Sequence, residues 1–371
     1  MKILYYIHTL GIGGAETIVV NYLLALQEHG HDVALVVNDH KDSFLAQRLL
    51  DKNITIHALR PDSAGGVLGK CKRGIWKFTN YYPKRWQQIF DTEKPDVLHV
   101  HTATNFMNRI NFPSQKMIYT FHGDVPRYMK LHGKKNFETI RKFAKEGMTF
   151  FSLSNEMSRD IKLFFDTDKI CYIPNGVELE KIRSKKYNKE TFLKESGLPE
   201  DAFLLGHVGR FHPVKNQERA IEVFAELLKR KPNAYLLFVG DGYAECLQKV
   251  KDTSEHLHVK ERVLFLGTRD DATQIMSILD AFILPSVAES FSLVLVEAQA
   301  QGVRAVASDV VPREVICNNN CFRLSLEESN EAWADYLLGD FTEDTGRDIE
   351  NFSMDKVIDD TICCYEEIVR S

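Results

Sequence analysis

The sequence contains no long hydrophobic run, and none of its apolar stretches approaches the roughly 18 residues that a membrane-spanning helix needs. Residues 1–8 are short and interrupted by polar side chains, so we expect a first β-strand there rather than a signal peptide. Of the 371 residues, 44% are hydrophobic and 27% are charged, as in soluble globular proteins. We therefore expect a cytoplasmic protein, with peripheral attachment to the inner face of the membrane as an option.

Paired cysteines are also missing. The seven cysteines are odd in number and include no Cys-x-x-Cys pair, and Cys317 and Cys321 have no histidine cluster that would complete a zinc site. Free thiols in a reducing compartment explain this pattern better than disulfides or metal. Asp166-Thr167-Asp168 has the form of a metal-binding pair, but it lies between a helical pattern and a β run and is expected to be a turn. No metal site and no cofactor are predicted.

Positive charge is concentrated in one part of an otherwise acidic chain. The net charge is −5, yet residues 65–145 hold sixteen Lys or Arg against five Asp or Glu, with aromatic residues between the cations. Two interpretations remain open: a solvated positive face, or a docking surface for anionic lipid headgroups or a phosphorylated lipid acceptor. Nucleic acid is not expected, because no binding motif accompanies the charge. The candidate acceptor or membrane residues are Lys72, Arg73, Lys84, Arg85, Arg127 and Lys130.

Short β runs alternate with helical patterns in both halves of the chain, which predicts an α/β protein with parallel sheets covered by helices on both faces. At 371 residues the chain is long enough for two domains. We expect two Rossmann-like, doubly wound domains: residues 1–178, joined by a C-terminal helix at about 353–371, and residues 179–352. Ligands of such folds bind at the carboxyl ends of the strands. The predicted strands are 3–7, 33–37, 55–59, 97–100, 117–121, 150–153, 170–173, 203–208, 234–239, 263–266, 281–284 and 305–307.

Two carboxylates, Glu289 and Glu297, are eight positions apart across a predicted strand-to-helix junction. Glu289 falls in the loop after the strand, and Glu297 about a turn and a half into the helix that ends near Gly302. The backbone amides of Ser290, Phe291, Ser292 and Leu293 lie between them at the helix N-terminus, which attracts anions. Two acids around an anion site suit a diphosphate with hydroxylated groups at both ends, such as a nucleotide-sugar.

Three further loops of the second half follow predicted strands. Arg210 and Lys215 are five positions apart, a spacing that lets both cations converge on one diphosphate, although two solvated surface cations remain the alternative. The turns Gly240-Asp241-Gly242 and Gly267-Thr268-Arg269 could contact the nucleotide base or simply connect a strand to a helix. Thr268 and Arg269 would offer backbone groups to a uracil edge.

In the first half, the loop Gly11-Ile12-Gly13-Gly14-Ala15-Glu16 follows the first strand. It nearly matches the dinucleotide-binding fingerprint, but Glu16 replaces the third glycine. The alternatives are a nicotinamide or flavin site, a plain tight turn, or a backbone wall beside a sugar diphosphate, and we favour the last. His122 follows another strand beside Gly123, and we expect it to be an active-site hydrogen-bonding group.

With these loops in place, the chain resembles the retaining family-4 glycosyltransferases of the GT-B fold, and most closely their exopolysaccharide- and capsule-forming branch. The resemblance covers nearly the whole length. It rests on the spacing of Glu289 and Glu297, which matches the family's E-x7-E signature, and on five further motifs. These are Gly13-Gly14-Ala15-Glu16, His122-Gly123, Ile173-Pro174-Asn175-Gly176-Val177, Val208-Gly209-Arg210 with Lys215-Asn216, and Gly240-Asp241-Gly242.

The resemblance implies two facing domains with a central cleft, a C-terminal helix that crosses back to the first domain, and a role for each motif. Arg210 and Lys215 would neutralise the departing diphosphate, in place of a metal ion. Glu297 would accept hydrogen bonds from the ribose, and Glu289 would bind the transferred sugar. The catalytic set would be Glu289, His122, Arg210 and Lys215. The donor-binding set would be Gly13, Gly14, Gly242, Thr268, Arg269, Ser290, Phe291, Ser292, Leu293 and Glu297.

The sequence therefore predicts a retaining hexosyl- or N-acetylhexosaminyl-transferase that uses a nucleotide-sugar, with UDP as the expected nucleotide, and a saccharide or lipid-linked acceptor. Transfer to a protein or soluble acceptor, a nucleotide-sugar epimerase, and a non-catalytic sugar-nucleotide-binding partner subunit remain as alternatives. Ser290 and Ser292 depart from the family pattern, because glycine or proline is frequent at these positions.

Overall fold

The computed structural model describes residues 1–371 except 12, 40–42, 61–79, 102–106, 344 and 371. The chain forms two compact units, which are described separately. Unit 1 comprises Met1–Gly176 and Met354–Ser371, and unit 2 comprises Val177–Ser353. These boundaries fall within two residues of those expected from the sequence.

Within its described residues, unit 1 is built on a seven-stranded sheet of order β3-β2-β1-β4-β5-β6-β7 in which all neighbouring strands are parallel. The direction of strand order reverses between β1 and β4, which creates the switch point where doubly wound folds bind ligands. The strands are β1 Lys2–Ile7, β2 Asp32–Asp39, β3 Thr55–Arg60, β4 Val97–His101, β5 Met117–Thr120, β6 Thr149–Ser152 and β7 Ile170–Tyr172.

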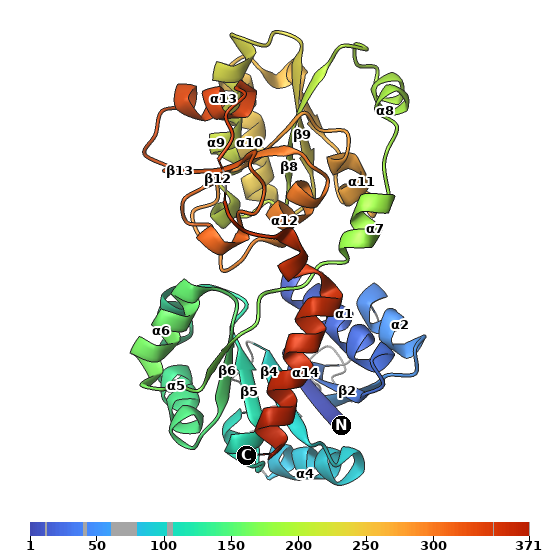
Figure 1. The fold of residues 1–371 in the computed structure, drawn as a ribbon, viewed down its shortest axis with the longest axis vertical. Helices are drawn as coiled ribbons and strands as arrows, with labels where there is room; N and C mark the ends of the chain where they lie inside the picture. The colour runs from blue at the N-terminus through green and yellow to red at the C-terminus, as the bar shows by residue number, and fades with distance from the viewer. Residues whose placement is uncertain (12, 40–42, 61–79, 102–106, 344, 371) are drawn as a thin grey trace, which may run out of the picture. The chain divides into compact units, whose positions relative to one another are not determined.

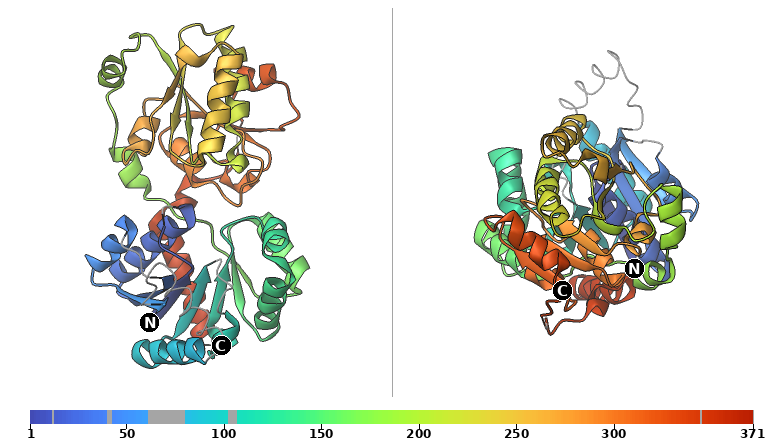
Figure 2. Two further views of the ribbon diagram at one scale, coloured as in Figure 1. Left: turned by 180° about the vertical axis from the view of Figure 1, so that it is seen from behind. Right: turned by 90° about the horizontal axis from the view of Figure 1, so that it is seen from above.

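Helices cover both faces of this sheet. On one face α14 packs against β4 and beside α1, as both ribbon figures show (Figures 1 and 2). On the other face, aromatic side chains of α4 and α6 pack under the strands: Trp86 contacts Tyr6, and Phe165 contacts Phe121 and Phe150. The helices are α1 Gly14–Glu28, α2 Phe44–Leu50, α4 Tyr81–Glu93, α5 Val125–Lys145, α6 Asn155–Phe165 and α14 Met354–Arg370.

Unit 2 is also doubly wound. Its six-stranded sheet has the order β10-β9-β8-β11-β12-β13, and all neighbouring strands are parallel. Its switch point lies between β8 and β11. The sheet is buried by large apolar residues such as Phe224, Phe238 and Trp333, each at most 1% exposed. The strands are β8 Phe203–Val208, β9 Ala234–Val239, β10 Val263–Phe265, β11 Ala281–Leu284, β12 Arg304–Ser308 and β13 Cys321–Leu324.

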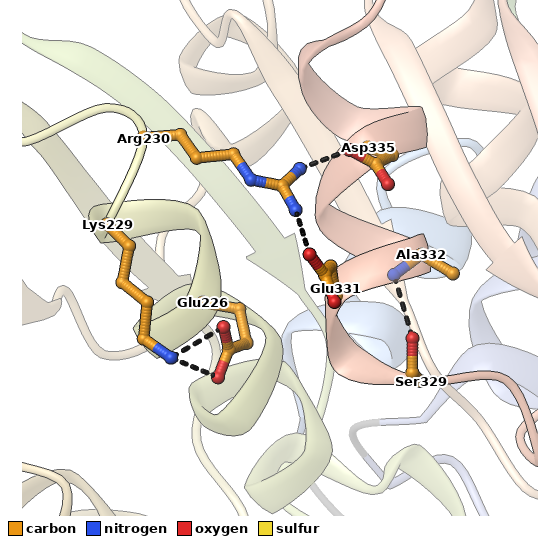
Figure 3. A network of polar contacts seen from close by, with 7 residues as sticks. All are labelled: Glu226, Lys229, Arg230, Ser329, Glu331, Ala332 and Asp335. Carbon is orange, nitrogen blue, oxygen red and sulfur yellow. Dashed lines mark hydrogen bonds and ion pairs between the residues drawn. The ribbon is translucent and has the colours of Figure 1, made fainter.

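The position of α9 in unit 2 is fixed by contacts with α13 (Figure 3). Arg230, just after the end of α9, is bound by Asp335 and by Glu331, the latter at 3.2 Å. Ser329 caps α13 by accepting a hydrogen bond from Ala332 N at 3.1 Å. The helices are α7 Leu179–Ser184, α8 Lys189–Glu195, α9 Gln217–Leu228, α10 Ala244–His256, α11 Ala272–Met276, α12 Leu293–Ala300 and α13 Asn330–Leu338.

The twelve predicted strands are all present, and the fold class is confirmed. The prediction omitted β13, which adds an edge strand beyond β12, and α13, which packs against β11 and β12. The charge-rich segment 178–199, whose composition is typical of a connection between two domains, contains the helices α7 and α8. The turn predicted at Asp166 is confirmed: Asp166 ends α6 in the left-handed conformation, before β7 begins.

Candidate active site

In unit 2, the loops that follow β8 and β11 meet at the switch point. Val287 N, in the second loop, donates a hydrogen bond of 2.8 Å to Val214 O in the first. Lys215 Nζ lies 2.6 Å from Glu289 Oε1, and Ser286 Oγ donates to the same oxygen at 2.7 Å. The two loops thus form one polar assembly at the carboxyl edge of the sheet, where a ligand of this fold is expected.

A short 3-10 turn positions Lys215 beside the residues of the second loop. Pro213–Lys215 form a 3-10 turn (η3), and His212 Nδ1 accepts a hydrogen bond of 3.1 Å from Val214 N at its start. The 209–216 loop itself contains no acidic residue, and the carboxylate that neutralises Lys215 comes from the neighbouring loop as Glu289.

The guanidinium of Arg210, unlike the ammonium group of Lys215, has no partner in the part of the chain that the structure describes. Its side chain is exposed, and among the described residues no carboxylate or carbonyl group binds its guanidinium. The surrounding backbone is held firmly, since Gln217 Nε2 donates to Arg210 O at 3.0 Å. A cation on a fixed backbone at the sheet edge can form a forked pair of hydrogen bonds with a phosphate.

The turn Gly240-Asp241-Gly242 supports that backbone. A Cβ on Gly242 would lie 2.2 Å from Phe211 O, and one on Gly240 would lie 2.3 Å from Gly209 O. Gly240 also has a φ of +132°. These glycines therefore allow two backbone segments to approach closely. Close packing alone thus requires a glycine at position 242, whether or not Gly242 contacts a ligand.

The entry to α12 is strained. Ser292, the residue before the helix, has φ 109° and ψ 79°, a conformation that L-residues rarely adopt. Its buried Oγ has no hydrogen-bond partner in the described part of the chain. Phe291 packs its ring 5.2 Å from that of Phe352, so only its backbone can face a ligand. The amides of Leu293 and Val294 have no intrahelical acceptor, as in the first turn of any helix.

Glu297 lies in the second turn of α12, with its side chain half-buried. Burial raises the pKa of its carboxyl to about 7. No described residue forms a hydrogen bond or ion pair with this carboxyl group. A poorly solvated acid without a partner is a candidate for ligand binding.

Arg269 is engaged elsewhere. Its Nε and Nη2 atoms lie 2.8 Å and 2.7 Å from the two carboxylate oxygens of Asp271, and this pairing raises the pKa of Arg269 further above its usual value. Thr268 is exposed beside it. The guanidinium is thus bound by a carboxylate, and the carbonyl oxygen of Gly267 in the same turn already accepts a hydrogen bond of 2.8 Å from Gly240 N.

In unit 1, His122 belongs to a chain of ring contacts. Its Nε2 lies 2.9 Å from His101 Nδ1, and the His101 ring stacks on that of His99 with centroids 4.0 Å apart. His99 in turn bonds Tyr365 of α14 at 2.6 Å. Burial lowers the pKa of His122 to about 4 and that of His101 well below its usual value. These imidazoles are therefore neutral at pH 7.

After β1, Gly13 is the N-cap residue of α1 and Gly14 is its first residue. A Cβ on Gly13 would lie 2.3 Å from Glu16 Oε2, so the Glu16 carboxylate lies back over the glycine loop. An acid in the first turn is favourable with respect to the helix dipole. The sequence analysis predicted that this loop lies beside a sugar diphosphate. The Glu16 carboxylate therefore places a negative charge close to the predicted position of another negatively charged group.

The structure describes four of the six candidate basic residues. Lys72 and Arg73 lie outside the described residues. Arg85 donates to Ala58 O at 3.2 Å and is half-buried, whereas Lys84 is exposed. Arg127 and Lys130 are exposed on α5, which continues with further exposed cations after an interruption at Gly133.

The sequence analysis missed several residues that the structure brings to these sites. Ser286, Tyr365 and the α5 lysines Lys134 and Lys135 had no motif to mark them. Ser286 follows the buried strand β11, as Glu289 does, and that position was the available signal. In the described residues, no helix is long and apolar enough to cross a membrane, and no cluster of three or more metal-ligating side chains is found.

Two family models match the chain, one for each half. Glycosyltransferase Family 4 matches residues 12–181, and Glycosyl transferases group 1 matches residues 188–339. The EpsF protein of Bacillus subtilis, named as a glycosyltransferase, is 31% identical over 46% of this chain. The UDP-Gal:alpha-D-GlcNAc-diphosphoundecaprenol alpha-1,3-galactosyltransferase of Escherichia coli is 29% identical over 63% of it. The matches span 44% and 61% of those two proteins.

Solved structures share the fold over the full chain. HepE of Anabaena in complex with UDP and glucose has a TM-score of 0.72 at 18% identity, covering 100% of this chain and 98% of that one. A glycosyltransferase from Rickettsia africae has a TM-score of 0.75 at 19% identity, with the same coverage. The family models, the relatives and the two parallel-sheet units agree. The chain therefore belongs to the family-4 glycosyltransferases of the GT-B fold.

Proposed function

We propose that this glycosyltransferase moves a hexosyl or N-acetylhexosaminyl group from a UDP-linked donor, with retention of configuration, to a lipid-linked saccharide or lipid during the synthesis of an exopolysaccharide or capsule. The observation that carries the donor proposal is the junction of the two switch-point loops in unit 2. That junction brings Arg210, Lys215 and Glu289 to one edge of the sheet, next to the N-terminus of α12. The same helix carries Glu297, whose carboxyl group has no partner among the described residues.

Each of these groups is chemically complementary to one part of a nucleotide-sugar. A diphosphate is bound by Lys215, the exposed Arg210 and the first amides of α12. Glu297 accepts hydrogen bonds from the ribose hydroxyls, and Glu289 from the sugar hydroxyls. The bound UDP in HepE and the donor in the name of the Escherichia coli relative support UDP as the nucleotide.

The transfer needs no protein nucleophile. The bond between the sugar C1 and the β-phosphate oxygen breaks, and the acceptor oxygen bonds to C1 from the same face. The acceptor's proton passes to the departing phosphate. Arg210 and Lys215 stabilise the negative charge that develops on the diphosphate, so the proposed reaction is metal-independent. We also propose that neutral His122 takes part as a hydrogen-bonding group.

The acceptor proposal rests on charge and on relatives. The Escherichia coli relative's name specifies a diphosphoundecaprenol acceptor. In unit 1, α5 presents the exposed side chain of Leu131 among cations, and a cavity of about 590 Å³ lies along it. The lining residues are Asn108, Lys134, Lys135, Glu138, Thr139, Lys142 and Phe143. Lysines around an apolar cavity suit a partner with anionic headgroups and acyl chains, as on the inner face of a membrane.

The test is incubation with a panel of nucleotide-sugars, with and without an undecaprenyl-diphosphate-linked saccharide, followed by analysis of the anomeric configuration by proton NMR. The proposal predicts a glycosylated lipid product with the donor's anomeric configuration. An inverted product contradicts retention. Conversion of the donor to an epimer without acceptor supports an epimerase, and binding without any product supports a non-catalytic subunit. Product formed only with a soluble or protein acceptor contradicts the lipid acceptor.

A further inference from the structure

A buried serine binds the carboxylate of Glu289 in unit 2. Strand β11 ends at Leu284, and Ser286 lies in the loop that follows, with 0% of its surface exposed. Its hydroxyl group donates a hydrogen bond of 2.7 Å to Glu289 Oε1 and has no other partner among the described residues. Because Glu289 is ion-paired with Lys215, its carboxylate can only accept, and the direction of the bond from Ser286 is fixed.

The backbone around Ser286 is held from both neighbouring strands of the sheet. Ser308, at the end of β12 and also 0% exposed, donates from Oγ to Ser286 O at 2.6 Å. Val287 N, on the next residue, donates to Val214 O at 2.8 Å in the loop that follows β8. Both acceptors are carbonyl oxygens, so these bonds also have only one possible direction. The hydroxyl group of Ser286 is therefore carried by a backbone with little freedom to move.

The two oxygens of the Glu289 carboxylate have different surroundings. Oε1 accepts from Ser286 Oγ and also lies 2.6 Å from Lys215 Nζ. No residue in the described part of the chain forms a hydrogen bond or ion pair with Oε2. The side chain of Glu289 keeps 10% of its surface exposed. Oε2 is thus the oxygen that remains for hydrogen bonds with a ligand.

The two contacts at Oε1 respond differently to a bound diphosphate. The ammonium group of Lys215 is a point charge on a flexible stem, so a phosphate can attract it away from Glu289. The hydroxyl group of Ser286 is neutral, buried and attached to a fixed backbone, so a phosphate does not displace it. In the proposed function, Ser286 is therefore the contact that remains at Oε1 while the donor is bound.

We propose that Ser286 is a positioning residue that holds Glu289 Oε1, so that Oε2 stays directed at the hydroxyl groups of the transferred sugar after Lys215 has bound the diphosphate. This inference rests on the proposed function of Glu289. A hydrogen-bond acceptor that is held in place before the reaction stabilises the transition state without reorganisation. Ser286 itself binds neither the nucleotide nor the diphosphate, so its loss affects turnover and leaves UDP binding intact.

The test is a double-mutant cycle with the full-length protein, using the nucleotide-sugar and acceptor that give product in the panel described above. Ser286→Ala should lower kcat about tenfold, as expected for the loss of one hydrogen bond to a charged group, with little change in the donor KM. In a Glu289→Ala background, the same substitution should change kcat less than about twofold. An equal loss in both backgrounds overturns the proposal, because Ser286 would then act without Glu289.

Calorimetry with UDP separates positioning from damage to the whole assembly. The UDP affinity of Ser286→Ala should stay within about twofold of the wild type, because Lys215 and the other phosphate-binding groups remain. A loss of UDP affinity as large as the loss of kcat contradicts the proposal, since a disordered loop would impair both.

Ser308→Ala is the matched control, because it removes an equally buried serine hydroxyl that bonds to Ser286 O and does not touch Glu289. It should lower Tm about as much as Ser286→Ala but lower kcat less than about threefold. Equal losses of kcat in the two variants contradict a specific role of Ser286. Wild-type turnover of Glu289→Ala contradicts the proposed function of Glu289, whereas an impaired Glu289→Ala with a fully active Ser286→Ala contradicts the role of Ser286 alone.

Discussion

Lys215 Nζ and Glu289 Oε1 lie 2.6 Å apart, although the two residues belong to loops that follow different strands, β8 and β11. In the proposed function they bind different parts of the donor, the diphosphate and the sugar. In that function, a phosphate bound to Lys215 would compete with Glu289 for the same ammonium group. Its binding would free Glu289 to accept hydrogen bonds from the sugar, so that binding of the diphosphate and binding of the sugar would be coupled.

Replacing Glu289 with Gln should separate binding from turnover. Loss of the competing carboxylate should tighten UDP binding about two- to fivefold, a change within the range of partly exposed ion pairs. Turnover should fall roughly 100-fold, because the sugar loses a charged acceptor. Calorimetry with UDP and a transfer assay measure the two effects. Ser286→Ala, which removes the other hydrogen bond to Glu289 Oε1, is the control and should change UDP affinity less than twofold.

Ser292→Gly should stabilise the protein. A non-glycine residue at φ 109° is strained, and strain of this kind costs about 1–3 kcal/mol. Part of the gain is offset by the greater entropy of glycine in the unfolded chain, so we expect about 1 kcal/mol in urea unfolding. Ser292→Ala removes the buried hydroxyl but keeps the strain. Equal stability of the two variants would show that the backbone is not the cause.

Glu297→Gln should be more stable than the wild type at alkaline pH. Burial raises the pKa of Glu297 from 4.5 to about 7, so between these values the folded state holds a proton that the unfolded state releases. Raising the pH through this range therefore destabilises the wild type. Because the side chain keeps partial exposure, we expect a difference of about 2 kcal/mol above pH 7 and almost none below pH 4.5. Urea unfolding at pH 4, 6 and 8 measures it, and a pH-independent difference would contradict the assignment.

Charge reversal on α5 should weaken membrane attachment. Each lysine near an anionic surface contributes about 1 kcal/mol, so Lys134→Glu with Lys135→Glu should lower binding to phosphatidylglycerol vesicles about tenfold or more. Lys194→Glu with Lys249→Glu makes the same charge change on exposed residues of unit 2. Sedimentation with vesicles compares the two. Equal loss in both variants would indicate a net-charge effect, and no loss in either would remove α5 as the docking surface.

The sequence was sufficient to predict most strands, because each is a short apolar run bounded by turn residues. It missed β13, whose run of Cys321 to Leu324 is interrupted by Arg323, and α7 and α8, whose charged surfaces resemble a linker. Within the site, spacing predicted that Arg210 and Lys215 share a loop. It could not predict that Lys215 pairs with Glu289, or that Tyr365 supports His99, because these contacts join residues 74 and 266 positions apart.

The central claim is that unit 2 binds a nucleoside diphosphate at the junction of the β8 and β11 loops, and calorimetric titration with UDP tests it most directly. Arg210→Ala and Lys215→Ala should each weaken binding about tenfold or more, because each removes a charge-assisted contact with phosphate. Arg269→Ala removes a cation that Asp271 already neutralises and should change the affinity less than twofold. Wild-type affinity in the Arg210 and Lys215 variants, or an equal loss in all three, would contradict the account.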